Sequence, residues 1–139
     1  MGIFFHVEDT DFKLSYKSKY KNWIKAILSD EGFTLGNLNF IFTSNSYLLQ
    51  INRRYLNHDY FTDVITFDYN DGLLVSGDIY ISVDQVMINA QEFNTTFNNE
   101  LARVIIHGVF HLLGHSDSTE KERNEMRAKE NGALQSLEL

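Results

Sequence analysis

The amino-acid sequence predicts a mixed α/β domain, of the α/β or α+β class, with about four strands and about five helices. Two observations lead to this fold class. Short runs rich in β-branched and aromatic residues alternate with longer stretches whose apolar residues recur at the period of a helix. The chain has 139 residues, which suits one compact domain, so we expect residues 1–139 to form a single domain around one mixed sheet.

Four segments have the composition of strands. The expected strands are residues 3–7, 38–43, 64–67 and 73–83. Asn70-Asp-Gly72 is a turn signal, so the last two strands are expected to form a hairpin. The chain contains no proline, and glycine, asparagine and aspartate therefore mark the breaks between elements.

Five segments have helical spacing or a capping residue, which gives the order βαβαββααα. The expected helices are residues 16–28, a helix after Ser44, residues 84–93, a helix from Asn98 or Asn99 to Gly114, and a helix from Ser118 or Thr119 to about Leu134. Ser44 and Asp84 are expected to be N-caps. The buried stripe of the second helix is expected to be Tyr47, Leu48, Ile51 and Tyr55.

Composition excludes several classes of protein. There is no cysteine, which rules out disulfides, a cysteine nucleophile and cysteine-ligated metal sites. No apolar run approaches the roughly 20 residues of a membrane span, and the first residues lack a signal-peptide pattern, so we expect a cytoplasmic protein.

The net charge is −7, but it is unevenly distributed. Residues 1–60 have a balance of +1, and residues 61–139 a balance of −8. The cations of the first half include Lys17, Lys21, Lys25, Arg53 and Arg54. Only this half is suited to hold a polyanion, although the same lysines would also suit a solvated helix face.

The segment from His107 to Asp117 carries the clearest chemistry. His107 and His111 are four residues apart within an apolar helix, so both imidazoles can reach one ion. Gly114 favours the end of the helix, and Asp117 can then fold back toward the same ion. Because Gly114 favours a stop, the neighbouring His115 is not expected to be the third ligand.

The spacing also matches the metzincin pattern H-E-x-x-H-x-x-G-x-x-H, with aspartate in the last position. The glutamate that serves the protease as general base is Gly108 here, so the peptidase chemistry is not expected. What remains is a three-ligand metal site with room for water, of the kind that catalytic zinc uses. Since the ligating imidazoles must be neutral, metal affinity is expected to fall as the pH drops through roughly 6.

This segment resembles the metal signature of the YbeY endoribonuclease family, H-G-x-x-H-L-x-G-y-x-[HD]. Two upstream blocks are also similar to that family. The first block is Ile51–Tyr55 with Asp59–Phe67, and the second is Gly77-Asp-Ile-Tyr-Ile-Ser82. The three blocks occur in the family's order over about residues 48–130, more than half of the chain.

The resemblance implies a metal-dependent endoribonuclease of the bacterial cytoplasm. It implies action in ribosomal RNA maturation, chiefly at the 3′ end of the small-subunit RNA, and in ribosome quality control. The implied partners are ribosomal RNA and the small ribosomal subunit, and the implied cofactor is one zinc ion per chain. His107, His111 and Asp117 are the implied metal ligands, through which catalysis would proceed.

Two positions depart from the family pattern. An arginine commonly follows the tyrosine of the first upstream block, where this chain has Leu56, and Phe61 stands where the family commonly has proline. Arg53, Arg54 or His58 could replace the missing arginine. We expect RNA contacts at Arg53 and Arg54 and at the lysines Lys17, Lys21 and Lys25.

Other interpretations stay open at this stage. Asp63 or Asp59 could orient the attacking water, or either could simply cap a turn, and His115 could act as an acid, contact phosphate or be a plain loop residue. The chain could also be a metal-dependent hydrolase of a peptide or small molecule. A third interpretation is a non-catalytic, zinc-stabilised module associated with the ribosome.

Overall fold

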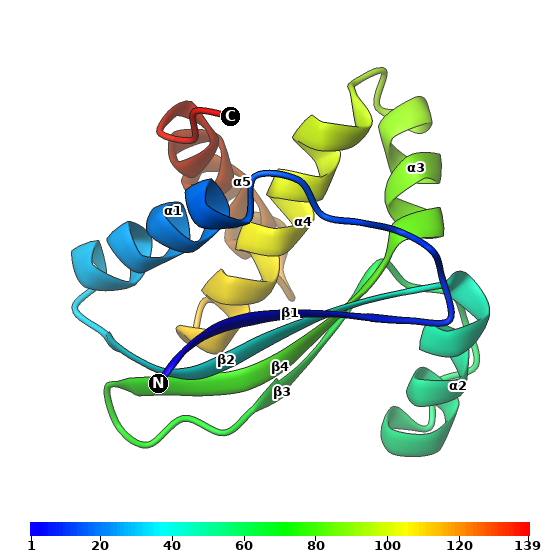
Figure 1. Ribbon diagram of the computed structural model, residues 1–139, viewed down its shortest axis with the longest axis horizontal. Helices are drawn as coiled ribbons and strands as arrows, with labels where there is room; N and C mark the ends of the chain where they lie inside the picture. Colours follow the sequence, from blue (N-terminus) through cyan, green and yellow to red (C-terminus); the bar gives the residue numbers. More distant parts are fainter.

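The fold is built around a four-stranded mixed sheet with the strand order β1-β2-β4-β3 (Figure 1). The structure is a computed structural model that describes residues 1–139. The strands are β1 (Gly2–Glu8), β2 (Thr34–Thr43), β3 (Val64–Asp68) and β4 (Leu74–Ser82). β1, β2 and β4 run parallel, and β3 pairs antiparallel with β4 through the predicted hairpin. The fold class and the order βαβαββααα are therefore confirmed.

Five helices pack with this sheet. They are α1 (Lys17–Asp30), α2 (Asn45–Leu56), α3 (Val83–Glu92), α4 (Phe97–Leu112) and α5 (Glu120–Gln135). α1, α4 and α5 lie on one face of the sheet, as Figure 1 shows, and α4 contacts β3, β4, α3 and α5. No helix is both long and apolar enough to cross a membrane.

The central position of α4 explains its composition. Leu101, Val104, Ile105, Ile106 and Val109 are all buried, because the helix is enclosed by the sheet on one side and by helices on others. These residues belong to one hydrophobic cluster that also includes the buried side chains of α1 and three of β2, namely Leu38, Phe40 and Phe42. A helix buried on most sides has no solvated stripe, so polar side chains within it need a specific partner.

The expected caps were right for α2 and wrong for two other helices. Ser44 accepts the Tyr47 N–H at 3.1 Å, as predicted. The N-cap of α3 is Ser82 rather than Asp84, whose carboxylate instead accepts the N–H of Asn45 at 2.8 Å.

The N-terminal cap of α4 lies upstream of the predicted position. The N-cap of α4 is Thr96 rather than Asn98 or Asn99, and the Asn99 N–H donates to the Thr96 hydroxyl. At the start of α5, Thr119 was one of the two expected caps, and it forms a reciprocal capping box with Glu122.

The expected buried stripe of α2 is wrong at Tyr55. This ring is 62% exposed and packs edge-on against Phe67 on the sheet. Asn52 is the buried residue of this helix turn, because its amide donates to the Tyr60 carbonyl at 2.9 Å. This hydrogen bond ties α2 to the segment that leads into β3, and thereby shapes one side of the site described below.

Candidate metal centre

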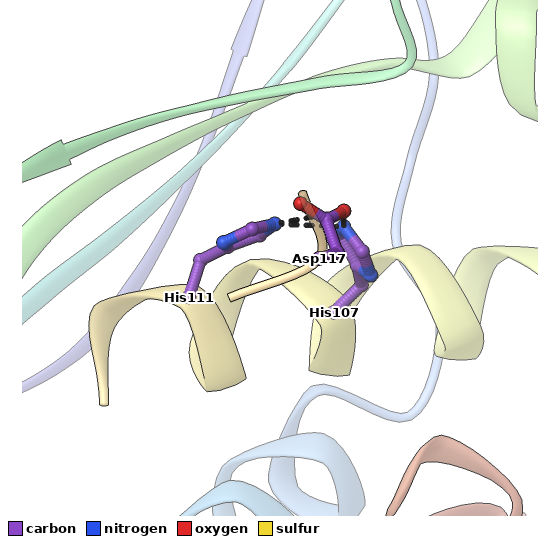
Figure 2. Close-up of side chains that lie close together, drawn as sticks. All are labelled: His107, His111 and Asp117. Atoms are coloured by element: carbon purple, nitrogen blue, oxygen red, sulfur yellow. Dashed lines mark hydrogen bonds and ion pairs between the residues drawn. The ribbon is translucent and has the colours of Figure 1, made fainter. Parts of the chain in front are cut away.

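Three side chains converge at the C-terminal end of α4. His107 and His111 project from successive turns, and Asp117 comes back from the loop before α5 (Figure 2). The two imidazole Nε2 atoms are 3.0 Å apart, and each lies 3.4 Å from Asp117 Oδ2. Two atoms bound to one tetrahedral zinc at its usual bond length lie about 3.3 Å apart, so this donor set fits a single ion.

The backbone turn at the end of α4 brings Asp117 to this position. Gly114 has a φ of +95°, and the His115 N–H donates to the Phe110 carbonyl at 3.0 Å, which closes the helix end. The helix therefore stops before Gly114, as predicted. His115 does not join His107 and His111. Its Nε2 forms a hydrogen bond with Glu31 Oε1 at 2.5 Å.

A buried glutamate that the sequence analysis missed orients His107. Glu130 of α5 is only 5% exposed, and its Oε2 accepts a hydrogen bond from His107 Nδ1 at 2.6 Å. This contact leaves Nε2 of the ring available for a metal, an arrangement that is widespread among metal-binding histidines. One feature of the sequence could have indicated this role. Glu130 lies on the same helix face as the apolar residues Met126 and Ala133, where a charged side chain needs a partner.

Glu130 also controls the protonation of His107. Burial lowers the pKa of His107, but the hydrogen bond and the negative charge of Glu130, helped by Asp117 and Asp63, outweigh burial and raise it. Because the pKa of His107 is raised, protons compete with a metal for the ring up to a higher pH than at an ordinary histidine. Glu130 itself is held by Arg103, whose Nη1 donates to its other oxygen at 3.0 Å.

Two clefts meet at His107 and Asp117, two of the three candidate ligands. The first, which we call the metal cleft, has a volume of about 530 Å³ and lies between α4, β3 and the segment after α2. The second, which we call the arginine cleft, has a volume of about 260 Å³ and lies between α3, α4 and α5. His107, Asp117 and Asp63 line both clefts, so a chain-like ligand could pass from one to the other across the histidine pair.

Of the two aspartates considered for a role beside the metal, only Asp63 lies at the site. Asp59 is exposed, pairs with Arg53 at 2.5 Å and lines neither cleft. Asp63 accepts a hydrogen bond from the Asn89 amide at 3.1 Å. Burial raises the pKa of Asp63 above its usual value, although the charge of His107 and several hydrogen bonds oppose the shift.

The five cations predicted to contact RNA lie outside both clefts. Lys17, Lys21 and Lys25 belong to α1, and Arg53 and Arg54 to the last turns of α2. Their role as an RNA surface stays a prediction.

The position of the missing family arginine does face the metal cleft. Leu56 lines the cleft, together with a stacked pair formed by His58 and Tyr60, whose ring centroids are 5.2 Å apart. His58, one of the three residues considered as a substitute for that arginine, is therefore the one that reaches the site.

Substituting Glu130 tests the arrangement around His107. We expect Glu130→Gln to weaken zinc binding about 10–100-fold at pH 8, because the ring loses its charged acceptor. The pH at which affinity begins to fall should also move downward, since the group that raises the pKa of His107 is gone and burial then lowers it. Competition titrations against a chelator from pH 5.5 to 8.5 measure both effects.

The matched control for this variant is Glu125→Gln, which changes an exposed carboxylate of the same helix. It should leave both the affinity and its pH dependence unchanged. Equal zinc affinity of Glu130→Gln and the unsubstituted protein at pH 8 would contradict the role given to Glu130.

Comparison with known proteins places these features in a family. A family model described as endoribonuclease YbeY matches residues 4–138. Proteins named endoribonuclease YbeY from Parabacteroides distasonis and Cytophaga hutchinsonii are 45% identical over 134 residues and 46% identical over 133 residues. These matches cover 96% and 95% of this chain, and 94% and 93% of the respective relatives.

A solved structure is also similar. The solution structure of TM1509 from Thermotoga maritima aligns with a TM-score of 0.68 and 29% sequence identity, over 97% of this chain and 88% of that protein. The match over nearly the whole sequence leaves no doubt about the relationship, and the chain belongs to the endoribonuclease YbeY family.

Proposed function

We propose that this chain cleaves RNA endonucleolytically at one zinc ion held by His107, His111 and Asp117. The observation that carries the proposal is the convergence of these three donors at the spacing of a tetrahedral site, in a member of an endoribonuclease family. Two imidazoles and one carboxylate are ligands that zinc accepts, and three protein ligands leave a coordination position open. We further propose that residues 1–139 act as a single domain.

The chemistry divides between the ion and the chain. A zinc ion bound at this site supplies positive charge to the phosphate and activates water as a nucleophile. Asp63 lies beside His107 with a raised pKa, so its carboxylate is suited to orient the attacking water and to accept a proton. Glu130 keeps His107 in the ligating orientation throughout.

The substrate proposal is small-subunit ribosomal RNA, chiefly its 3′ end, within the bacterial cytoplasm. Family membership supports this assignment, and it extends to the small ribosomal subunit as partner and to a role in ribosome quality control. The distant phosphates of such a long substrate would contact Lys17, Lys21 and Lys25 of α1, and Arg53 and Arg54 of α2, outside the two clefts.

A cleavage assay with metal removal tests the proposal. Purified zinc-loaded protein should cut a precursor of small-subunit RNA internally, because the phosphate needs the charge of the ion. A chelator should abolish cleavage, added zinc should restore it, and His111→Ala should be inactive at every zinc concentration. Mapping the new RNA ends on a gel measures the result.

The other outcomes discriminate the competing functions. Cleavage that persists with chelator, or in His111→Ala, would contradict the proposal. A protein that loses thermal stability on chelation but never cuts RNA would instead be the non-catalytic ribosome-associated module. Zinc-dependent hydrolysis of a peptide or small ester without RNA cleavage would identify the general hydrolase.

A further inference from the structure

The arginine cleft contains a buried acid that the metal centre does not use. Glu100, in the first turn of α4, is only 4% exposed and lines this cleft. No hydrogen bond or ion pair within the chain engages its carboxylate. Burial raises the pKa of Glu100, although the positive charges of Arg103 and Arg127 oppose the shift. No side-chain oxygen of the protein is both fully buried and unpaired, so the unpaired carboxylate of Glu100 is accessible from the cleft that it lines. A first-turn position favours its negative charge through the helix dipole, but no group of the chain donates to it.

Cationic side chains lie in the same cleft. Arg123 and Arg127 are one turn apart on α5, and neither pairs with a carboxylate, whereas Arg103 is occupied by Glu130. Arg127 makes no side-chain hydrogen bond, and Arg123 donates to the Ser118 carbonyl at 3.1 Å. Arginine without a carboxylate partner is suited to a phosphate group.

An aromatic ring completes the cleft. Phe93, at the end of α3, lines it and is 60% exposed. An exposed ring beside a polar cavity provides a surface on which an unpaired base can stack. The cleft thus offers a stacking surface, a buried acceptor and cations, and it opens directly onto His107 and Asp117.

We propose that the arginine cleft is a guanine-nucleotide subsite for the RNA strand, and this inference rests on the proposed endoribonuclease function. Glu100 accepts hydrogen bonds from the edge of the base, Phe93 stacks on the base, and Arg127, assisted by Arg123, contacts a phosphate. The neighbouring phosphate of the same strand then lies at the metal.

Guanine fits a carboxylate better than the other bases do. An ionised carboxylate is acceptor-only, with two oxygens side by side. The Watson–Crick edge of guanine presents two adjacent donors, an imino and an amino group, whereas each of the other bases has one donor group there. Inosine lacks only the amino group, and it is therefore a matched probe for the Glu100 contact.

Binding of mononucleotides to the zinc-loaded protein tests the subsite without cleavage. We expect guanosine 5′-monophosphate to bind about tenfold more tightly than inosine 5′-monophosphate, as for loss of one hydrogen bond to a charged group. In Glu100→Gln the ratio should fall to within twofold, with zinc content and melting temperature maintained. Isothermal titration calorimetry measures each affinity.

Charge reversal on α5 tests the phosphate contact. Arg127→Glu should weaken both nucleotides equally, because the phosphate is common to them. Lys121→Glu is the matched control, since Lys121 lies on the same helix outside the cleft and should be without effect. Equal affinity for the two nucleotides, or a guanine preference that survives in Glu100→Gln, would overturn the subsite.

The two proposals fail separately. RNA cleavage by a protein that does not distinguish the two nucleotides would overturn the guanine subsite and leave the function in place. A Glu100-dependent guanine preference in a protein that never cleaves RNA would support the nucleotide subsite and overturn the endoribonuclease proposal.

Discussion

Asp117→Ala is expected to release most of the bound zinc, whereas His115→Ala, two residues away, should retain it. Asp117 Oδ2 lies 3.4 Å from the Nε2 atoms of both His107 and His111, and losing it removes one of three donors. The loss should exceed the ~10–100-fold typical of residues that only support a ligand. His115 instead forms a hydrogen bond with Glu31, which also accepts a hydrogen bond from Lys129.

Elemental analysis after dialysis against a weak chelator gives the measurement. Asp117→His serves as a rescue variant, because the family signature accepts histidine there, and it should hold zinc. Retention of zinc by Asp117→Ala together with its loss in His115→Ala would show that the histidine completes the site, and the assignment would then be wrong.

The sequence alone contained enough information to predict the three converging residues. A four-residue spacing fixes two side chains on one helix face, and a glycine at the helix end limits where the chain can return. These are local rules, and they act within the eleven positions from His107 to Asp117. The observed helix end at Gly114 follows the same rules.

The rest of the site depends on contacts between distant segments. Glu130 reaches His107 only because α5 packs against α4, and the register of that packing is not encoded in either helix by itself. The arginine cleft likewise combines residues of α3, α4 and α5. The charge clusters along the sequence predict RNA contacts on α1 and α2, which stay a prediction. Those clusters could not reveal the arginines beside the metal ligands, because clustering in sequence does not report proximity to the metal.

The wrong predictions for the helices also arise from contacts between distant segments. Asp84 was expected to cap its own helix, but the neighbouring α2 begins beside it and supplies a different N–H donor. Tyr55 has the spacing of a buried residue, yet the edge strand β3 is too short and peripheral to cover it. Apolar periodicity identifies the face of a helix, while the extent of burial depends on how far the neighbouring element extends.

Gly108 is the position where the metzincin pattern has its catalytic glutamate, and replacing it is expected to destabilise the fold rather than confer protease chemistry. A Cβ added at Gly108 would lie 2.8 Å from Ile79 Cγ2 and 3.5 Å from Val64 Cγ2, both on the sheet. The contact with Val64 is an ordinary van der Waals distance, so Ile79 is the obstruction. Its side chain is branched and fully buried, and it therefore has little room to move aside. Overpacking of this kind typically costs about 1–3 kcal/mol, more than the roughly 1 kcal/mol that alanine gains over glycine in a helix.

We therefore expect Gly108→Ala to lower the free energy of unfolding by about 1 kcal/mol, and Gly108→Glu to lower it further by forcing a carboxylate against the sheet. Gly132→Ala is the matched control, because that helical position has nothing within 4 Å of an added Cβ, and it should stabilise the protein. Urea denaturation of the three variants measures the difference. Equal stabilisation at both glycines would contradict the packing argument, whereas the expected contrast would mean that close contact between α4 and β4 excludes a glutamate at this position.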